Sequence, residues 1–267
     1  MSSLSPNSLK TYEYIQPDYI DRKHPYSDQV IYTPFSQGKA LGDRYRLVDP
    51  NWNGSCYALS WSWIAQKLSR KSLMKPSNFQ MKNKATIVLS DYEDIEKIRN
   101  LFHSTCLHSL TFISDDDLEK KPNPLASNPI IAFFESFYHS NMCALIGAIG
   151  SIRKREADGK DGEVIKTWGH ACAFIMKADH TCAWFDPNYG EVSFKNFLDF
   201  AKWYQKETTK GRLRYITKGQ AILSKTRNHL WTTDNLMIEY TSFDQEEIND
   251  FRRLYKGKAP KEIEYHF

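Results

Sequence analysis

Cys56 is placed in this sequence where a thiol can act as a nucleophile. The residues before it, Asn53–Ser55, favour a loop, and apolar side chains recur at three- and four-residue spacing through Leu59–Leu68. This pattern predicts a helix that begins at or near Cys56. The unpaired N–H groups and the dipole of a first helical turn stabilise a thiolate, so we expect the thiol pKa to lie below its ordinary range. A lone cysteine can equally be a core residue, so the assignment depends on partners elsewhere in the chain.

A histidine and a carboxylate in the second half of the chain supply such partners. Val164–Met176 and Thr181–Phe185 are rich in strand-forming residues, and the polar break between them predicts a β-hairpin. If the hairpin centres on Ala178, His170 lies directly opposite Asp186, with Cβ atoms about 4.5–5.5 Å apart. A slip of one residue would place the two side chains on opposite faces. The spacing therefore predicts a His–Asp pair held by the sheet.

Together these residues suit catalysis by a thiolate nucleophile. His170 would take the proton of the Cys56 thiol and later deliver it to the leaving group. Asp186 would accept a hydrogen bond from the other ring nitrogen and fix the orientation of the imidazole. A negatively charged intermediate also needs donors, for which the backbone N–H of Cys56 and the side-chain amide of Asn51 are the candidates, with Asn53 as the next choice.

Two His-x-Cys pairs in the same region raise the alternative of a zinc site. His170 and Cys172 lie in the first strand, whereas His180 and Cys182 begin the second. In the predicted hairpin His180 is at the turn and His170 is near the far end of its strand. One tetrahedral ion could not bind all four residues, so we expect no metal and no cofactor, with Cys172 and Cys182 as core residues.

Three motifs in the chain resemble those of the YopT/AvrPphB family of bacterial effector cysteine proteases. They are Asn-Gly-Ser-Cys-Tyr-Ala-Leu-Ser-x-x-Trp around Cys56, Gly-His-Ala at Gly169–Ala171, and Phe-Asp-Pro-Asn-Tyr-Gly at Phe185–Gly190. The resemblance implies an α+β, papain-like cysteine protease fold, in which the nucleophile helix packs on a central antiparallel β-sheet. It also implies a Cys56–His170–Asp186 triad.

The same resemblance implies a function and a place of action. Members of the family are delivered into host cells, where some cleave prenylated Rho-type GTPases and others cleave protein kinases. We therefore expect a cysteine endopeptidase that a specialised bacterial secretion system delivers into the host cytoplasm, where it cleaves a host protein. Membrane contact would come only through a lipidated substrate.

Two other classes of function stay open on the sequence. A Cys-His-Asp triad can pass its acyl-thioester to an acceptor other than water, which would make the protein a deamidase, a transglutaminase-like enzyme or an acyltransferase. A catalytically silent binding module is the third possibility. The presence of all three triad residues counts against it.

Composition limits the remaining classes. The 267 residues contain 36 Lys and Arg against 32 Asp and Glu, without a dominant basic run, so we expect no nucleic-acid partner. Five irregularly spaced cysteines favour a reducing environment. The polar N-terminus lacks the features of a Sec signal, and no apolar run of transmembrane length occurs. We expect a monomer.

The chain divides by pattern into three parts. Residues 1–45 are expected to be an irregular N-terminal leader. Residues 46–210 would form the papain-like catalytic core, and residues 211–267 a C-terminal extension that completes or flanks the same domain.

Overall fold

The computed structural model describes residues 30–37, 55–70, 72–74, 111–114, 128–155, 161–209, 212–217, 221–224 and 229–255. The described elements in chain order are β1 (Val30–Pro34), α3 (Cys56–Leu68), β2 (Thr111–Ser114), α6 (Pro129–Glu135), β3 (Asn141–Arg155), β4 (Asp161–Met176), β5 (Cys182–Asp186), β6 (Gly190–Phe194), α7 (Phe197–Thr209), the short 3-10 helix η2 (Arg212–Ile216), β7 (Ala221–Ser224), β8 (His229–Phe243) and α8 (Gln245–Leu254). None of the described helices is long and apolar enough to cross a membrane.

An eight-stranded antiparallel sheet forms the centre of the molecule, in the order β1-β6-β5-β4-β3-β8-β2, with β7 paired to β8. Its long strands are β3, β4 and β8. β1 pairs with β6, although it belongs to the stretch expected to be irregular. β8, from the C-terminal part of the chain, pairs with β3 along nearly its whole length.

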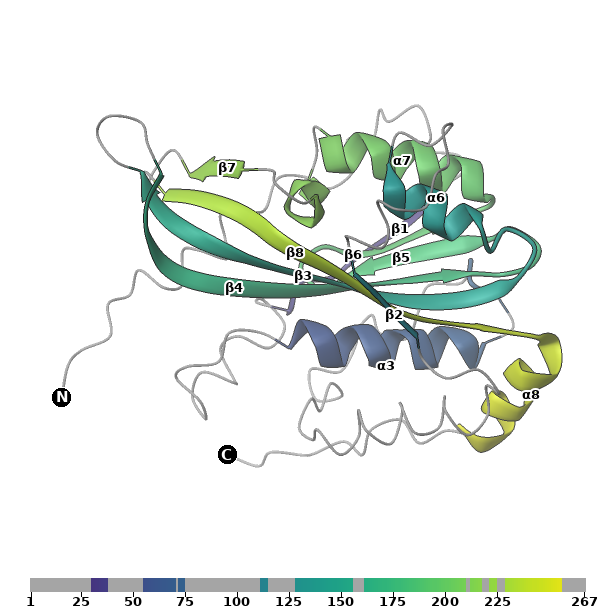
Figure 1. The fold of residues 1–267 in the computed structure, drawn as a ribbon. Coiled ribbons are helices and arrows are strands. Elements are labelled where there is room, and N and C mark those ends of the chain that lie inside the picture. The colour runs from purple at the N-terminus through teal and green to yellow at the C-terminus, as the bar shows by residue number, and fades with distance from the viewer. Residues whose placement is uncertain are drawn as a thin grey trace.

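Helices cover both faces of the sheet (Figure 1). Side chains from α6, α7 and η2 pack with one face, and those from α3 and α8 pack with the other. Alternate residues of β4 enter the two clusters: Cys172 and Phe174 face α7, whereas Ala171 and Ala173 face α3. The expected α+β architecture, with the Cys56 helix packed on an antiparallel sheet, is confirmed.

Small residues on the sheet allow α3 to lie close to it. Ala171, Ala173 and Ala183 are all buried in the cluster that contains this helix. The Ser60 hydroxyl donates a hydrogen bond of 3.2 Å to the carbonyl oxygen of Ala171, which ties the helix to β4 near its first turn. The start of α3, and Cys56 with it, is thereby fixed against the middle of β4.

A buried ion pair fastens the other end of α3. Lys67 and Glu191 of β6 form a short contact, with side chains that are 0% and 3% exposed. Glu191 also accepts a 2.8 Å hydrogen bond from the Trp63 indole, and Lys67 donates one of 2.8 Å to the carbonyl oxygen of Leu73. These polar partners offset the cost of removing both charges from water.

The hairpin between β4 and β5 forms as predicted, but its register differs from the expected one. Ala173 lies opposite Phe185, and Met176 lies opposite Cys182. The turn therefore centres on Asp179, one residue later than Ala178. His170 is not directly opposite Asp186.

The sequence of the turn explains the longer connection. The Asp179 carboxylate accepts hydrogen bonds of 3.0 Å and 2.6 Å from the backbone N–H and the hydroxyl of Thr181. His180 adopts a positive φ of 67°, a conformation in which histidine is enriched. These local bonds stabilise the turn in this form. Because the partner of each residue changes by two positions, every side chain keeps the face that was predicted for it.

Candidate active site

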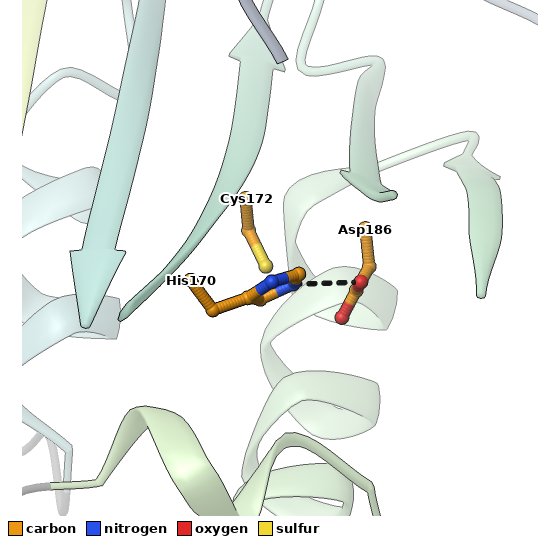
Figure 2. Close-up of side chains that lie close together, drawn as sticks. All are labelled: His170, Cys172 and Asp186. Atoms are coloured by element: carbon orange, nitrogen blue, oxygen red, sulfur yellow. Dashed lines mark hydrogen bonds and ion pairs between the residues drawn. The ribbon is translucent and has the colours of Figure 1, made fainter. Parts of the chain in front are cut away.

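His170 and Asp186 form the centre of the site (Figure 2). His170 Nε2 lies 3.0 Å from Asp186 Oδ1, and the two side chains are 8% and 0% exposed. Continuing the observed register places Asp186 opposite Cys172, two residues from His170 on the same face of the hairpin. Long side chains can span such a diagonal pair. The predicted contact is therefore present, although the predicted alignment of the strands was wrong.

The buried carboxylate of Asp186 has two donors besides His170. The backbone N–H of Asn188 donates a 2.8 Å hydrogen bond to Oδ1. The Tyr215 hydroxyl donates a short hydrogen bond to Oδ2. The Tyr215 ring also packs edge-on against the His170 imidazole, with centroids 5.2 Å apart. The donors compensate the buried negative charge and hold the carboxylate in one orientation.

The thiol of Cys56 lies beside the same imidazole. Cys56 is the first residue of α3 and is half-buried. Burial by itself raises the pKa of this thiol, but the hydrogen bond and charge of His170, with backbone hydrogen bonds from Ala171 and Tyr57, lower the pKa below its ordinary value. The predicted effect of a helix start on the thiolate thus combines with that of a neighbouring imidazolium.

The surroundings of His170 favour its protonated form, the imidazolium. Burial lowers its pKa, but the charge of Asp186, the neighbouring Cys172 and the hydrogen bond to Asp186 more than offset this, so the net pKa lies well above 6.5. An imidazolium favoured by Asp186 and a thiolate favoured by that imidazolium stabilise each other. The arrangement supports an ion pair between Cys56 and His170.

A second cysteine, Cys172, also lies next to His170, with its sulfur near the ring (Figure 2). Its surroundings have the opposite effect. Burial and the negative charge of Asp186 raise the pKa of the Cys172 thiol to about 12, and its sulfur lies 3.3 Å from the Tyr215 hydroxyl. The surroundings thus favour the neutral thiol at Cys172 and the thiolate at Cys56.

The same cluster contains three side chains of the types that bind metal ions. The potential ligand atoms of His170, Cys172 and Asp186 all lie within 4.8 Å of one another. His180 and Cys182 do not belong to this group in the part of the chain that the structure describes, so the four-ligand alternative is not assembled. The Asp186 carboxylate already accepts hydrogen bonds from Asn188 and Tyr215, and the Cys172 sulfur contacts the Tyr215 hydroxyl, so these atoms are engaged within the protein.

The backbone at the start of α3 offers donors for an oxyanion. Ser55 occupies the N-cap position without making a side-chain cap, and the first turn contains no acidic residue. The N–H groups of this turn thus have no carboxylate of their own helix to neutralise them. Asn51 and Asn53, the candidates for a side-chain donor, lie outside the described residues.

Sequence reasoning missed two residues of the site. Tyr215 lies in η2 and Gln37 follows β1, and both reach the site from parts of the chain that were assigned no role in it. No spacing to Cys56, His170 or Asp186 pointed to either residue. Only the packing of η2 and β1 on the sheet brings them there.

One segment of the sequence is similar to a known protein family. Residues 150–222 match the model of the Peptidase_C58 family, described as Yersinia/Haemophilus virulence surface antigen. The matched segment contains His170, Asp186 and Tyr215, but not Cys56. No curated protein matches the sequence.

The chain is distantly similar to solved structures. Among them is PatoxP, a cysteine protease-like domain of the Photorhabdus asymbiotica toxin PaTox, with 10% sequence identity and a TM-score of 0.36. The similarity covers 85% of this chain and 58% of that one, so this chain corresponds to little more than half of the solved domain.

The family match supports a cysteine-protease-like protein. The resemblance to the YopT-like family that the sequence motifs indicate is confirmed by the family match over residues 150–222.

Proposed function

We propose that the protein is a cysteine endopeptidase whose catalytic residues are Cys56, His170 and Asp186. One observation carries the proposal: a single imidazole contacts both a thiol of lowered pKa and a buried carboxylate. The thiolate is the nucleophile, the imidazolium is the acid, and the carboxylate keeps the ring charged and oriented.

The reaction follows from these positions. The Cys56 thiolate attacks the carbonyl carbon of a peptide bond, and N–H groups at the start of α3 stabilise the oxyanion. The tetrahedral intermediate collapses as His170 transfers its proton to the leaving amine, which gives an acyl-thioester on Cys56. Neutral His170 then takes a proton from water, the resulting hydroxide adds to the thioester, and collapse releases the carboxylic acid and the Cys56 thiolate.

The substrate is proposed from the resemblance. We infer that a bacterium delivers the protein into a host cell, where it acts as a monomer on a host protein of the prenylated GTPase or protein kinase class. The name of the matched family, a virulence surface antigen, supports a role at the boundary between bacterium and host.

A survey of new protein termini in host-cell lysate tests this function. Lysate treated with the wild-type protein should contain N- and C-termini that are absent after treatment with Cys56→Ala. Mass shifts of about one unit or the mass of an added amine, without new termini, would assign the triad to a deamidase or transglutaminase-like enzyme instead. A lysate that the protein leaves unchanged in both respects would contradict an enzymatic role.

A further inference from the structure

We infer that Gln37 is a positioning residue that sets the Cys56 thiol at its place beside the His170–Asp186 pair. The inference rests on the proposed function and adds to it a residue from the stretch that was expected to be an irregular leader. Gln37 is only 2% exposed. A buried side-chain amide requires hydrogen-bond partners, and those of Gln37 lie on both sides of the site.

One partner lies directly before the nucleophile. Gln37 Oε1 accepts a 2.8 Å hydrogen bond from the backbone N–H of Ser55, the N-cap residue of α3. Ser55 makes no side-chain cap of its own. The amide of Gln37 therefore fixes the peptide unit that enters the helix at Cys56.

The other partner, Asn188, lies two residues after Asp186. Gln37 Nε2 donates a 2.8 Å hydrogen bond to Asn188 Oδ1, and the backbone N–H of Asn188 donates one of 2.8 Å to Asp186 Oδ1. A continuous series of hydrogen bonds thus runs from Ser55 through Gln37 and Asn188 to Asp186. It joins the residue before Cys56 to the carboxylate that contacts His170.

The backbone around Gln37 is anchored to the residues that follow Asp186. The N–H of Gln37 donates a 2.7 Å hydrogen bond to the carbonyl oxygen of Pro187, and the N–H of Phe35 donates one of 3.0 Å to that of Tyr189. β1 is further held by its pairing with β6. Because the main chain is anchored independently, loss of the Gln37 amide would remove its hydrogen bond to Ser55 while β1 stays in place.

The position of Ser55 matters because the Cys56 thiolate depends on its distance from His170. A thiolate is favoured by the imidazolium and by the first-turn N–H groups only at close range. An outward movement of the entry to α3 would weaken both interactions. The thiol pKa would then rise toward its ordinary value.

The test is the rate of Cys56 alkylation by iodoacetamide as a function of pH, measured on the full chain by mass spectrometry. Gln37→Met keeps the length of the side chain and removes the amide. At pH 6 we expect Cys56 to react about 10-fold more slowly in this variant than in the wild type, which corresponds to a rise of about one unit in its apparent pKa. Turnover at pH 6 should fall in parallel, while KM stays within about 2-fold.

The matched control is Gln66→Ala on the same helix. The side-chain oxygen of Gln66 is buried and finds no hydrogen-bond partner among the described residues. This variant should keep the wild-type alkylation profile. A slowing equal to that of Gln37→Met would assign the effect to general loosening of α3 and would overturn the inference.

A second variant tests the hydrogen bond between Gln37 and Asn188. Asn188→Ala removes the acceptor for Gln37 Nε2 and leaves the pairing of β1 untouched. It should slow alkylation in the same direction, and the double variant should be no slower than Gln37→Met alone. If Gln37→Met fails to fold, the alkylation profile of Asn188→Ala decides, and a wild-type profile there overturns the inference.

The inference and the proposed function fail in different ways. A fast Cys56 with the same pH profile in the wild type and in Gln37→Met would refute the role of Gln37 and leave the catalytic proposal standing. A wild-type protein in which Cys56 reacts no faster than an ordinary thiol would refute both.

Discussion

His170 Nε2 contacts Asp186 Oδ1 at 3.0 Å although the two residues are not opposite each other in the hairpin. The turn centres on Asp179 rather than on Ala178, and this shifts each strand partner by two positions. An even shift preserves the face of every side chain. The pair survives because the imidazole reaches along the strand to the carboxylate, which the Asn188 N–H and the Tyr215 hydroxyl hold from other directions.

Replacement of the nucleophile should separate activity from stability. Cys56→Ala is expected to abolish turnover and leave the melting temperature nearly unchanged, because a half-buried thiol at a helix start loses little packing when it is truncated. Proteolysis assays and thermal melts of the purified variant measure both effects. Wild-type turnover in Cys56→Ala would remove the basis of the proposed mechanism.

Cys143→Ala is the matched control for that experiment. Cys143 is fully buried on β3, in the cluster that contains α3. Its truncation leaves a cavity and should reduce the free energy of unfolding by about 1 kcal/mol, while turnover persists. The opposite outcomes of two cysteine variants distinguish a catalytic from a packing thiol.

The pH dependence of kcat/KM should be bell-shaped and wide. Its acidic limb should lie below the ordinary thiol pKa, because His170 lowers the pKa of Cys56. Its basic limb should lie above 6.5, because Asp186 raises the pKa of His170. In Asp186→Asn we expect lower turnover and a basic limb at lower pH, since the charge that favours the imidazolium is gone. An unshifted basic limb in this variant would show that Asp186 does not set the pKa of His170.

The raised pKa of His170 also links pH to stability. A group that binds its proton more tightly in the folded state stabilises the fold fully below its unfolded pKa, which is about 6.5 for histidine. This contribution is lost as the pH rises from that value through the higher folded pKa. Cys56→Ala removes the opposite contribution of the lowered thiol pKa. Urea unfolding of Cys56→Ala between pH 6 and pH 9 should therefore show a decline in the free energy of unfolding that is absent when His170→Gln is added. Equal slopes for the two proteins would contradict the raised pKa.

The hydroxyl of Tyr215 should matter through Asp186. Tyr215→Phe retains the ring against His170 and removes the donor to Asp186 Oδ2. We expect kcat/KM to fall about 10-fold, the effect of losing one hydrogen bond to a charged group. In the Asp186→Asn background the same change should have a much smaller effect, whereas equal effects in both backgrounds would show that Tyr215 acts by another route.

Tyr204→Phe provides the comparison for Tyr215→Phe. The Tyr204 hydroxyl is buried in the same region and finds no hydrogen-bond partner among the described residues. Its removal should leave turnover unchanged and should not lower the melting temperature, because no described hydrogen bond is lost and the desolvated hydroxyl is gone. A loss of activity equal to that of Tyr215→Phe would point to tyrosine packing rather than to the hydroxyl.

The ion pair between Lys67 and Glu191 should be needed for stability. Lys67→Met leaves a carboxylate buried without its cation, which typically costs about 3–5 kcal/mol of unfolding free energy. Lys67→Met with Glu191→Gln should recover a large part of this loss. The exposed pair Arg253–Asp250 is the control, and Arg253→Ala should change stability by less than about 1 kcal/mol in urea titrations. Equal costs for Lys67→Met and Arg253→Ala would refute the role of the buried pair.

The sequence by itself determined the local elements that carry the proposed triad. The helix start at Cys56 follows from loop-forming residues before it and apolar periodicity after it, and the hairpin follows from two strand-forming runs around a polar break. The period of two along a strand was sufficient to place His170 and Asp186 on one face. These signals are local, because backbone preferences and side-chain alternation depend on near neighbours in the chain.

Only the tertiary structure decided which residues surround the triad. Tyr215 and Gln37 reach Asp186 and Ser55 because η2 and β1 pack on the sheet. The two cysteines differ because burial and the charge of Asp186 raise the pKa of Cys172, whereas His170 and backbone hydrogen bonds lower that of Cys56. Such contacts join residues far apart in the chain, and no periodicity of one segment encodes the position of another, so they appear only when the sheet and its two helical layers are assembled.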